Sequence, residues 1–359
     1  MDDALKTSRL VPFTEEPLRF TGRGGDYFRI WIVNLLLTIV TLGIYSPWAK
    51  VRRLHYFYRH TELAGSTFDF HGSPIRILIG RAVALVMFGL YNYAVRLQSV
   101  WTIVTVAALM LVMPWLLRNS LRFRLYNTSW RGTRFHFRGS LGGAYCVFLL
   151  YGILTLITLG LAAPFAHQRL KAYQHGNSWF GRTPFSFQAG VGSFYVAYLL
   201  ALLGILAFVA LVFLIGIGGS LSALFSGQKS AGQLSPQAIF TTLAILWGAS
   251  ILVGLSVGSI FHAVITNLIW NNTRLGEHRI DCVMSPWGLM WVYASNFVLV
   301  VVTLGFFTPW AMVRLVRFQI ESLQFQRASD LQEFVDAEPE TVGAVGEEAA
   351  SIFDFDIAL

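Results

Sequence analysis

The side chains that could carry out chemistry show none of the spacings of catalytic or metal sites. The eight histidines include no H-E-x-x-H pair. The two cysteines, Cys146 and Cys282, provide neither a disulfide framework nor a four-ligand metal site. A nucleophile motif of the G-x-S-x-G type and a Walker loop are both absent from the sequence. We therefore predict a protein that is not an enzyme and that uses no cofactor and no metal.

The carboxylates approach a cluster at only two places, Glu62 with Asp69 and Glu277 with Asp281. We expect them to pair with neighbouring arginines. A hydrolase of lipid headgroups could use such carboxylates, and that membrane enzyme is the most remote of our hypotheses. Arg81 lies within a long apolar segment, where a charge either marks a functional site or reaches the membrane surface from the helix end.

These residues must be positioned by membrane helices, because only 13% of the 359 residues are charged and 55% are hydrophobic. Soluble domains carry about 25% charged residues. Seven segments are long and nearly uncharged, as spans of about 20 residues must be. These segments are residues 27–45, 75–95, 99–117, 145–164, 194–219, 238–260 and 288–308. We predict an all-α polytopic membrane protein of about seven transmembrane helices with small extramembrane β-hairpins.

The charge distribution divides the chain into three parts. Residues 1–26 form a polar N-terminal segment with a short strand, and residues 27–327 form a strongly basic transmembrane domain. Residues 328–359 form an acidic tail with nine Asp and Glu and no Lys or Arg. We expect the tail to be flexible and cytoplasmic. Basic residues beside spans attract anionic lipid headgroups, so membrane lipids are the expected partners. No nucleic acid is expected, and a protein partner or a homo-oligomer stays open.

One motif, T-L-G-x3-P-[W/F]-A-x2-R, occurs three times and predicts the end of one helix and the start of the next. Glycine favours a helix C-terminus and proline a first helical turn. The aromatic residue suits the membrane interface, and the arginine lies one turn later, within reach of headgroup phosphates. The residues of the three copies are Gly43, Pro47, Trp48 and Arg52; Gly160, Pro164, Phe165 and Arg169; and Gly305, Pro309, Trp310 and Arg314.

The similarity between the copies extends along the chain and indicates internal repeats of transmembrane helix, break, basic helix and strand. The predicted strands are Phe68-Asp69-Phe70 and Phe185-Ser186-Phe187, where apolar residues alternate. Asn34 and Asn296 lie thirteen residues before their prolines. Such residues either form hydrogen bonds between helices or line a pathway, and we consider Asn34, Asn296 and Arg81 as possible pathway residues. With seven spans, an odd number separates equivalent points, so we expect an inverted-topology repeat with Arg169 facing opposite to Arg52 and Arg314. One span more or fewer would give a parallel repeat.

The combination of F-x-G-x-x-G before the first span, the T-L-G-x3-P-W-A-x2-R motif and a following [N/H]-T-x-L resembles the YjgN-like bacterial inner-membrane proteins, a family of unknown function. The resemblance covers about residues 20–326. It implies a multi-pass protein of the bacterial inner membrane and brings no substrate, catalytic residue or cofactor. The middle copy departs from the pattern, with Phe165 for tryptophan and Ala163 before the proline.

Two hypotheses for function follow from the sequence. The first is a non-enzymatic transporter-like or lipid-handling protein, which a continuous polar cavity near Asn34 and Asn296 would favour. The second is a structural or regulatory membrane scaffold that binds a partner through its acidic tail, which a tightly packed bundle would favour.

Overall fold

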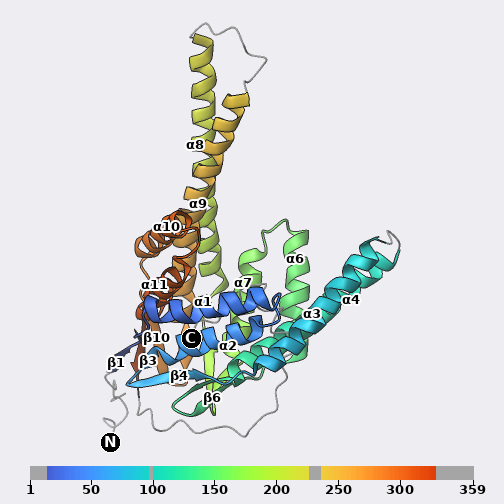
Figure 1. The fold of residues 1–359 in the computed structure, drawn as a ribbon, viewed down its shortest axis with the longest axis vertical. Helices are drawn as coiled ribbons and strands as arrows, with labels where there is room; N and C mark the ends of the chain where they lie inside the picture. The colour runs from blue at the N-terminus through green and yellow to red at the C-terminus, as the bar shows by residue number, and fades with distance from the viewer. Residues whose placement is uncertain (1–13, 97–99, 226–235, 329–359) are drawn as a thin grey trace, which may run out of the picture.

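The computed structural model describes residues 14–96, 100–225 and 236–328. These residues form five pairs of helices (Figure 1). The pairs are α1 (Gly24–Val40) with α2 (Ser46–Arg59), α3 (Pro74–Arg96) with α4 (Val100–Tyr126), the helix Leu141–Ile157 with α7 (Ala163–Gly176), α8 (Val191–Phe225) with α9 (Pro236–Asn271), and α10 (Pro286–Val302) with α11 (Thr308–Glu321). The helix Leu141–Ile157 consists of α5 (Leu141–Ala144), the π-helical η1 (Tyr145–Leu150) and α6 (Tyr151–Ile157).

Short strands join the helix pairs into one antiparallel sheet of eleven described strands, in the order β1-β11-β10-β9-β8-β7-β6-β5-β4-β3-β2. The strands are β1 (Thr14–Pro17), β2 (Arg19–Phe20), β3 (Thr61–Leu63), β4 (Ser66–Phe70), β5 (Thr128–Trp130), β6 (Thr133–Phe137), β7 (Ser178–Phe180), β8 (Thr183–Phe187), β9 (Thr273–Leu275), β10 (His278–Cys282) and β11 (Leu323–Arg327). From β2 to β11 each strand pairs with its neighbour in sequence, and β1 pairs with β11 instead of with β2.

The N-terminal segment brings the two ends of this sheet together and gives a nearly closed barrel. β1 pairs with β11, with Glu15 opposite Gln326, and β2 pairs with β3, with Arg19 opposite Glu62. Leu18 joins the two strands, and its backbone N–H donates to the Leu323 carbonyl at 3.3 Å. The barrel therefore satisfies strand edges that would otherwise be open.

The interior of the barrel is a packed apolar core. Its rings are close together: Phe135 and Phe180 have centroids 4.7 Å apart, and Trp130 lies 5.8 Å from Phe180. A cavity of about 50 Å³ remains, and its lining is wholly apolar, so it stays dry. The lining residues are Leu18, Leu63, Phe68, Trp130, Phe135, Phe180, Phe185, Trp270, Leu275, Ile280, Leu323 and Phe325.

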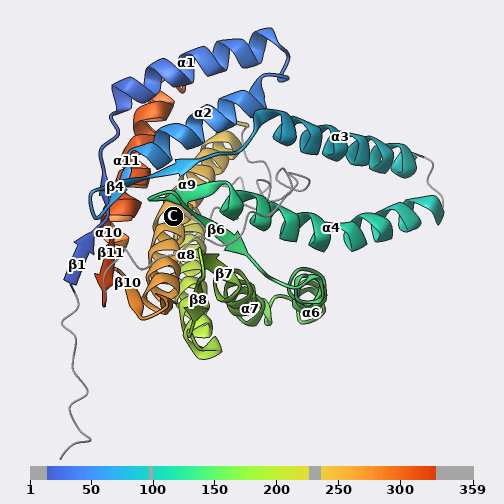
Figure 2. The same ribbon diagram turned by 90° about the horizontal axis from the view of Figure 1, so that it is seen from below.

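All five helix pairs leave the barrel at the same end. The odd-numbered strands β3 to β11 each follow a helix, and their partners run back toward the next helix. The two-residue turns of the hairpins therefore lie together at the opposite end; in the turn before β4, Ala64 and Gly65 both have positive φ, as a tight type I′ turn requires. The second helix of each pair packs against the first helix of the next pair, and α11 packs against α1. The pairs fan out in different directions (Figures 1 and 2).

The prediction of seven transmembrane helices in an all-α fold is wrong. Among the described residues, four helices are long and apolar enough to span a bilayer: α3, α4, α8 over Val191–Leu214 and α9 over Leu246–Asn271. The remaining expected spans, residues 27–45, 145–164 and 288–308, each overlap a helix of 17 residues that begins before the expected span and ends before the T-L-G turn. Such a helix is about 25 Å long, shorter than the hydrocarbon core. The expected spans were longer than these helices because the turn residues that follow each helix are apolar as well.

The expected β-hairpins and the inverted repeat also need correction. The strands at residues 68–70 and 185–187 are present, but they belong to the one closed sheet and not to separate hairpins. Each motif copy lies on a pair of helices that leaves the barrel and returns to it. An even number of helices therefore separates equivalent points, and Arg52, Arg169 and Arg314 lie on helices that run in the same sense, back toward the barrel. The three motif copies therefore do not have the opposite orientations that an inverted repeat requires.

Candidate functional site

The three copies of the motif form the same turn. The leucine and glycine both have positive φ: 50° and 92° at Leu42 and Gly43, 50° and 90° at Leu159 and Gly160. The glycine N–H of the first copy donates to the Thr38 carbonyl five residues earlier, at 2.7 Å. The motif threonine accepts from the N–H four residues later at 3.0 Å in every copy. The chain thus reverses at this turn, and the proline lies in the first turn of the returning helix.

The tips of these three helix pairs are apolar and exposed. Leu42, Leu159 and Leu304 are 94%, 93% and 90% exposed. Apolar side chains two residues to either side are exposed as well: Val40, Ile44, Ile157, Leu161, Val302 and Phe306. Residues 30–49, 139–166 and 282–313 carry no charged side chain. A contiguous apolar surface of this kind marks a site of contact with lipid or with a protein partner.

The aromatic residue after each proline contacts a ring of its own helix pair, and Trp310 also stacks on Phe28 of α1 at 4.9 Å. Trp48 stacks on Tyr45 at 6.0 Å, and Trp310 stacks on Phe307 at 5.9 Å. Phe165 meets Tyr151 edge-on at 5.1 Å. These contacts brace the turn against the helices on both sides of it.

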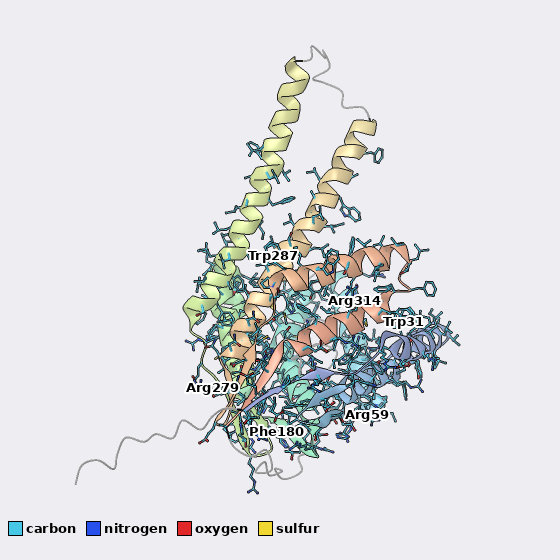
Figure 3. All side chains as sticks on the ribbon, turned by 90° about the vertical axis from the view of Figure 1, so that its left-hand side faces the viewer. Trp31, Arg59, Phe180, Arg279, Trp287 and Arg314 are labelled. Carbon is cyan, nitrogen blue, oxygen red and sulfur yellow. The ribbon has the colours of Figure 1, made fainter. Side chains whose placement is uncertain are left out.

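The motif arginines take different roles in the three copies. Arg52 and Arg169 are exposed, and their guanidinium groups lie 5.7 Å from the Tyr45 ring and 5.2 Å from the Phe165 ring. Arg314 is half-buried on the α10–α11 pair (Figure 3). It donates to Asn296 Oδ1 at 2.8 Å and to Ser295 Oγ at 3.0 Å.

The different surroundings of Arg314 and Arg52 predict different effects when each arginine is replaced. We expect Arg314→Met to lower the free energy of unfolding by about 1–3 kcal/mol, because it leaves the buried Asn296 oxygen without a donor. Arg52→Met, at the equivalent exposed position, should change it by less than about 0.5 kcal/mol. Denaturant titration of the two variants in detergent measures both values. Equal effects would contradict the assignment of a structural role to Arg314.

The two asparagines considered as pathway residues lie inside their helix pairs. Asn296 donates to the Ala311 carbonyl of α11 at 3.0 Å, so it joins α10 to α11. Asn34 is buried as well, but its Oδ1 has no hydrogen-bond partner. Arg81 of α3 donates through Nη1 to Ser46 Oγ at the start of α2. Arg81 therefore connects one helix pair to the motif turn of another.

The carboxylate pairs lie on the barrel. Asp69 of β4 accepts from Arg59 Nε at 2.9 Å and Nη2 at 3.2 Å. Burial alone would raise the pKa of Asp69, but hydrogen bonds from Arg59 and from the Phe70 N–H outweigh it, and the pKa lies below its usual value. In the parts of the chain that the structure describes, no group of three or more His, Cys, Asp and Glu residues could hold a metal ion.

A second candidate site, not anticipated from the sequence, lies on α7, the returning helix of the middle copy. Its centre is Lys171, which is half-buried. Positions three and four residues away on a helix are its surface neighbours. For Lys171 these four positions are His167, Gln168, Gln174 and His175. Every neighbour of the lysine on α7 is therefore a polar, nitrogen-bearing side chain.

Each of these side chains is held by different surroundings. Gln168 Nε2 donates to the Ala189 carbonyl at 2.9 Å, and His167 Nδ1 lies 3.1 Å from the Tyr198 hydroxyl. His175 packs against the rings of Phe187 and Trp270 at 5.7 and 5.4 Å. Gln174 is fully buried, and neither its Nε2 nor its Oε1 has a hydrogen-bond partner.

Burial disfavours positive charge across this face of α7. It lowers the pKa of Lys171 to about 8. Burial, followed by the charge of Lys171, lowers the pKa of His167 to about 4 and that of His175 to about 3. Among the described residues, no carboxylate contributes to the pKa of Lys171, and Lys171 forms no hydrogen bond or ion pair. The ammonium group is thus partly desolvated without a compensating anion.

The sequence did contain a signal for this site. At the same distance after the proline, the other two motif copies place apolar residues, Leu54 and Val316, where α7 has Lys171. The difference between the middle copy and the others therefore extends beyond Phe165 and Ala163 into the returning helix, where it marks the polar face of α7.

Comparisons with known proteins place this architecture in a family. The family described as "Bacterial protein of unknown function (DUF898)" matches residues 15–352. Inner membrane protein YjgN of Salmonella typhimurium is 25% identical over an aligned length of 365 positions, and the match covers 89% of this chain and 91% of that protein. Inner membrane protein YjgN of Escherichia coli K12 is 33% identical over 147 residues, 39% of this chain and 36% of that protein. No solved structure matches the chain.

Proposed function

Since the chain belongs to the DUF898 family of bacterial proteins of unknown function, we propose that it is a non-enzymatic inner-membrane protein that works among the lipids of the bilayer. Its barrel lies at one membrane face, and its five helix pairs enter the bilayer from that face. The α3–α4 and α8–α9 pairs span the bilayer. The other three pairs insert their tips and return to the same face.

The exposed apolar tips carry this proposal. A fully exposed leucine costs roughly 1.5–3 kcal/mol relative to an apolar environment, and Leu42, Leu159 and Leu304 are all at least 90% exposed. Insertion into the hydrocarbon core of the bilayer would remove that cost at all three tips. The exposed arginines Arg52 and Arg169 lie on the returning helices, where anionic headgroups would attract them by about 1 kcal/mol each. Anionic lipids are therefore the partners we propose.

The packed barrel argues for a lipid-handling role over transport along its axis. A route through the barrel would have to pass a dry apolar core with a cavity of about 50 Å³, and Asn34 and Asn296 lie inside helix pairs. The second candidate function is a membrane scaffold, which the packed interior of the barrel also favours. Its acidic tail, residues 328–359, lies almost wholly outside the described residues, and its binding to a partner and its cytoplasmic location stay predictions.

Cysteine labelling tests the one-sided insertion. In a background with Cys146→Ser and Cys282→Ser, single cysteines replace Thr67, Arg182 or Glu277 near the barrel turns, or Leu42, Leu159 or Leu304 at the tips. We expect a membrane-impermeant maleimide to modify the barrel cysteines from one face of the membrane only. The tip cysteines should react after detergent is added and not before. Barrel cysteines reactive from opposite faces, or tip cysteines reactive in intact membranes, would refute the proposal.

A further inference from the structure

The polar face of α7 has the composition of a binding site for a negatively charged group. Lys171 supplies three N–H donors, and the amide of Gln174, one turn further along α7, supplies two more donors and one acceptor. None of these groups is used by a hydrogen bond within the described part of the chain. Buried polar groups normally have partners, so the fully buried Gln174 lacks the partner that its burial requires. The half-buried Lys171 lies one turn away from it on the same helix.

The sign of the missing partner follows from the charges around it. No carboxylate of the described residues acts on Lys171, and the pKa values of the neighbouring histidines are lowered first by burial and then by its charge. An added cation would be repelled by the ammonium group of Lys171. An added anion would stabilise the ammonium group and accept its hydrogen bonds, which are the stronger charge-assisted kind.

The amide of Gln174 restricts the kind of anion that fits the site. Its Nε2 can donate to an oxyanion, but its Oε1 needs a donor, because it too is buried and unpaired. A phosphate group with a hydroxyl attached to it or next to it supplies both, as in hydrogenphosphate or a phosphoglycerol headgroup. A plain carboxylate brings no donor of its own for Oε1.

We propose that Lys171 and Gln174 bind a phosphate group that bears or adjoins a hydroxyl, supplied by a lipid headgroup or by a free phosphate compound. Gln168 and His167, held by Ala189 and Tyr198, frame the site on one side. His175, fixed between Phe187 and Trp270, frames it on the other. The site does not depend on the insertion of the helix tips, since it lies on the buried face of one returning helix.

Thermal unfolding of the full chain, delipidated in a neutral detergent, tests this site. The probes are inorganic phosphate, a short-chain phosphatidylglycerol, and the matching phosphatidylcholine, which carries no headgroup hydroxyl. A ligand that binds the folded state raises the unfolding midpoint as its concentration rises. We expect phosphate, phosphatidylglycerol or both to raise it, and phosphatidylcholine to have a much smaller effect.

The variants assign the effect to the residues. Lys171→Met should reduce the affinity for the active probe by at least about tenfold. Gln174→Leu should also reduce it, and it keeps the test valid if Lys171→Met does not fold. Arg169→Met is the matched control, because it removes an exposed cation from the same helix and should leave the midpoint shift unchanged.

The outcomes separate the two sources of phosphate. A shift with phosphatidylglycerol alone assigns the site to a lipid headgroup, and a shift with inorganic phosphate alone assigns it to a free phosphate compound. The proposal is overturned if neither probe shifts the midpoint, if phosphatidylcholine shifts it as much as phosphatidylglycerol does, or if the variants of Lys171 and Gln174 keep the full shift. The labelling of barrel and tip cysteines uses no ligand, so either proposal can fail without the other.

Discussion

Replacing Leu42, Leu159 or Leu304 by aspartate should destabilise the protein in a lipid bilayer, each by up to roughly 2.5–3.5 kcal/mol. That is the cost of placing aspartate in the hydrocarbon core of a membrane. The three leucines lie at the ends of separate helix pairs and are almost fully exposed within the chain. Their substitution breaks no intramolecular contact of comparable value, so the loss reports on the surroundings of the tip.

The measurement is the midpoint of unfolding in lipid bicelles for each single variant and for the triple variant. The three effects should add, because distant sites without shared partners are independent. Thr67→Asp is the control, since Thr67 is exposed on the barrel, which we place in water. If the tip variants behave like Thr67→Asp, the tips lie in water and the one-sided insertion of three helix pairs is incorrect.

The sequence predicted the local features of this fold because those features have local causes. The T-L-G-x3-P motif predicted a helix end and a new helix, and the structure has both in each copy. A glycine with positive φ and a proline in the first turn act within a few residues. The strand signal at Phe185-Ser186-Phe187 is equally local, since alternating apolar residues suffice for it.

The closure of the barrel could not be predicted in this way. β8 and β9 are adjacent in the sheet, although the α8–α9 pair separates them along the chain. Glu15 and Gln326 are opposite each other from the two ends of the described chain. Strands of two to five residues carry no signal for such partners, since their register depends on the packing of side chains from all of them.

The number of spans predicted from hydropathy is wrong for a physical reason. A hydropathy window sums apolar residues and does not register a reversal of the chain. At Leu42 the chain turns back within an apolar segment, and the turn itself is apolar because it faces outward. The same feature that caused the error, an apolar turn without charge, is the one that supports insertion of the tip into lipid.

The candidate site on α7 was not predicted from the sequence, for a different reason. Lys171, Gln174 and His175 match no motif, and isolated polar residues on a helix usually face water. Only the structure shows that Gln174 is fully buried and that it lacks hydrogen-bond partners. Burial is a property of the whole fold, so a polar site of this kind becomes visible only when the neighbouring helices and strands are in place.

The barrel core should be the most sensitive part of the molecule to truncation. Phe180 of β7 is 1% exposed, and its ring lies between those of Phe135 and Trp130. Phe180→Ala would remove a ring from a core that already contains a cavity, and such a change typically costs 3–5 kcal/mol. Because β7 joins β6 to β8, the loss would loosen the base from which all five helix pairs extend.

The neighbouring residue of the same strand provides the control. Trp179 is only partly buried, and its ring stacks under the guanidinium of Arg138 at 4.3 Å. Trp179→Ala removes a larger side chain from the outer face of the barrel, so it should lower the free energy of unfolding by less than about 1.5 kcal/mol. Denaturant unfolding in mixed micelles compares the two variants. A larger loss for Trp179→Ala than for Phe180→Ala would mean that the outer face of the barrel, packed against helices or lipid, stabilises the fold more than its apolar interior does.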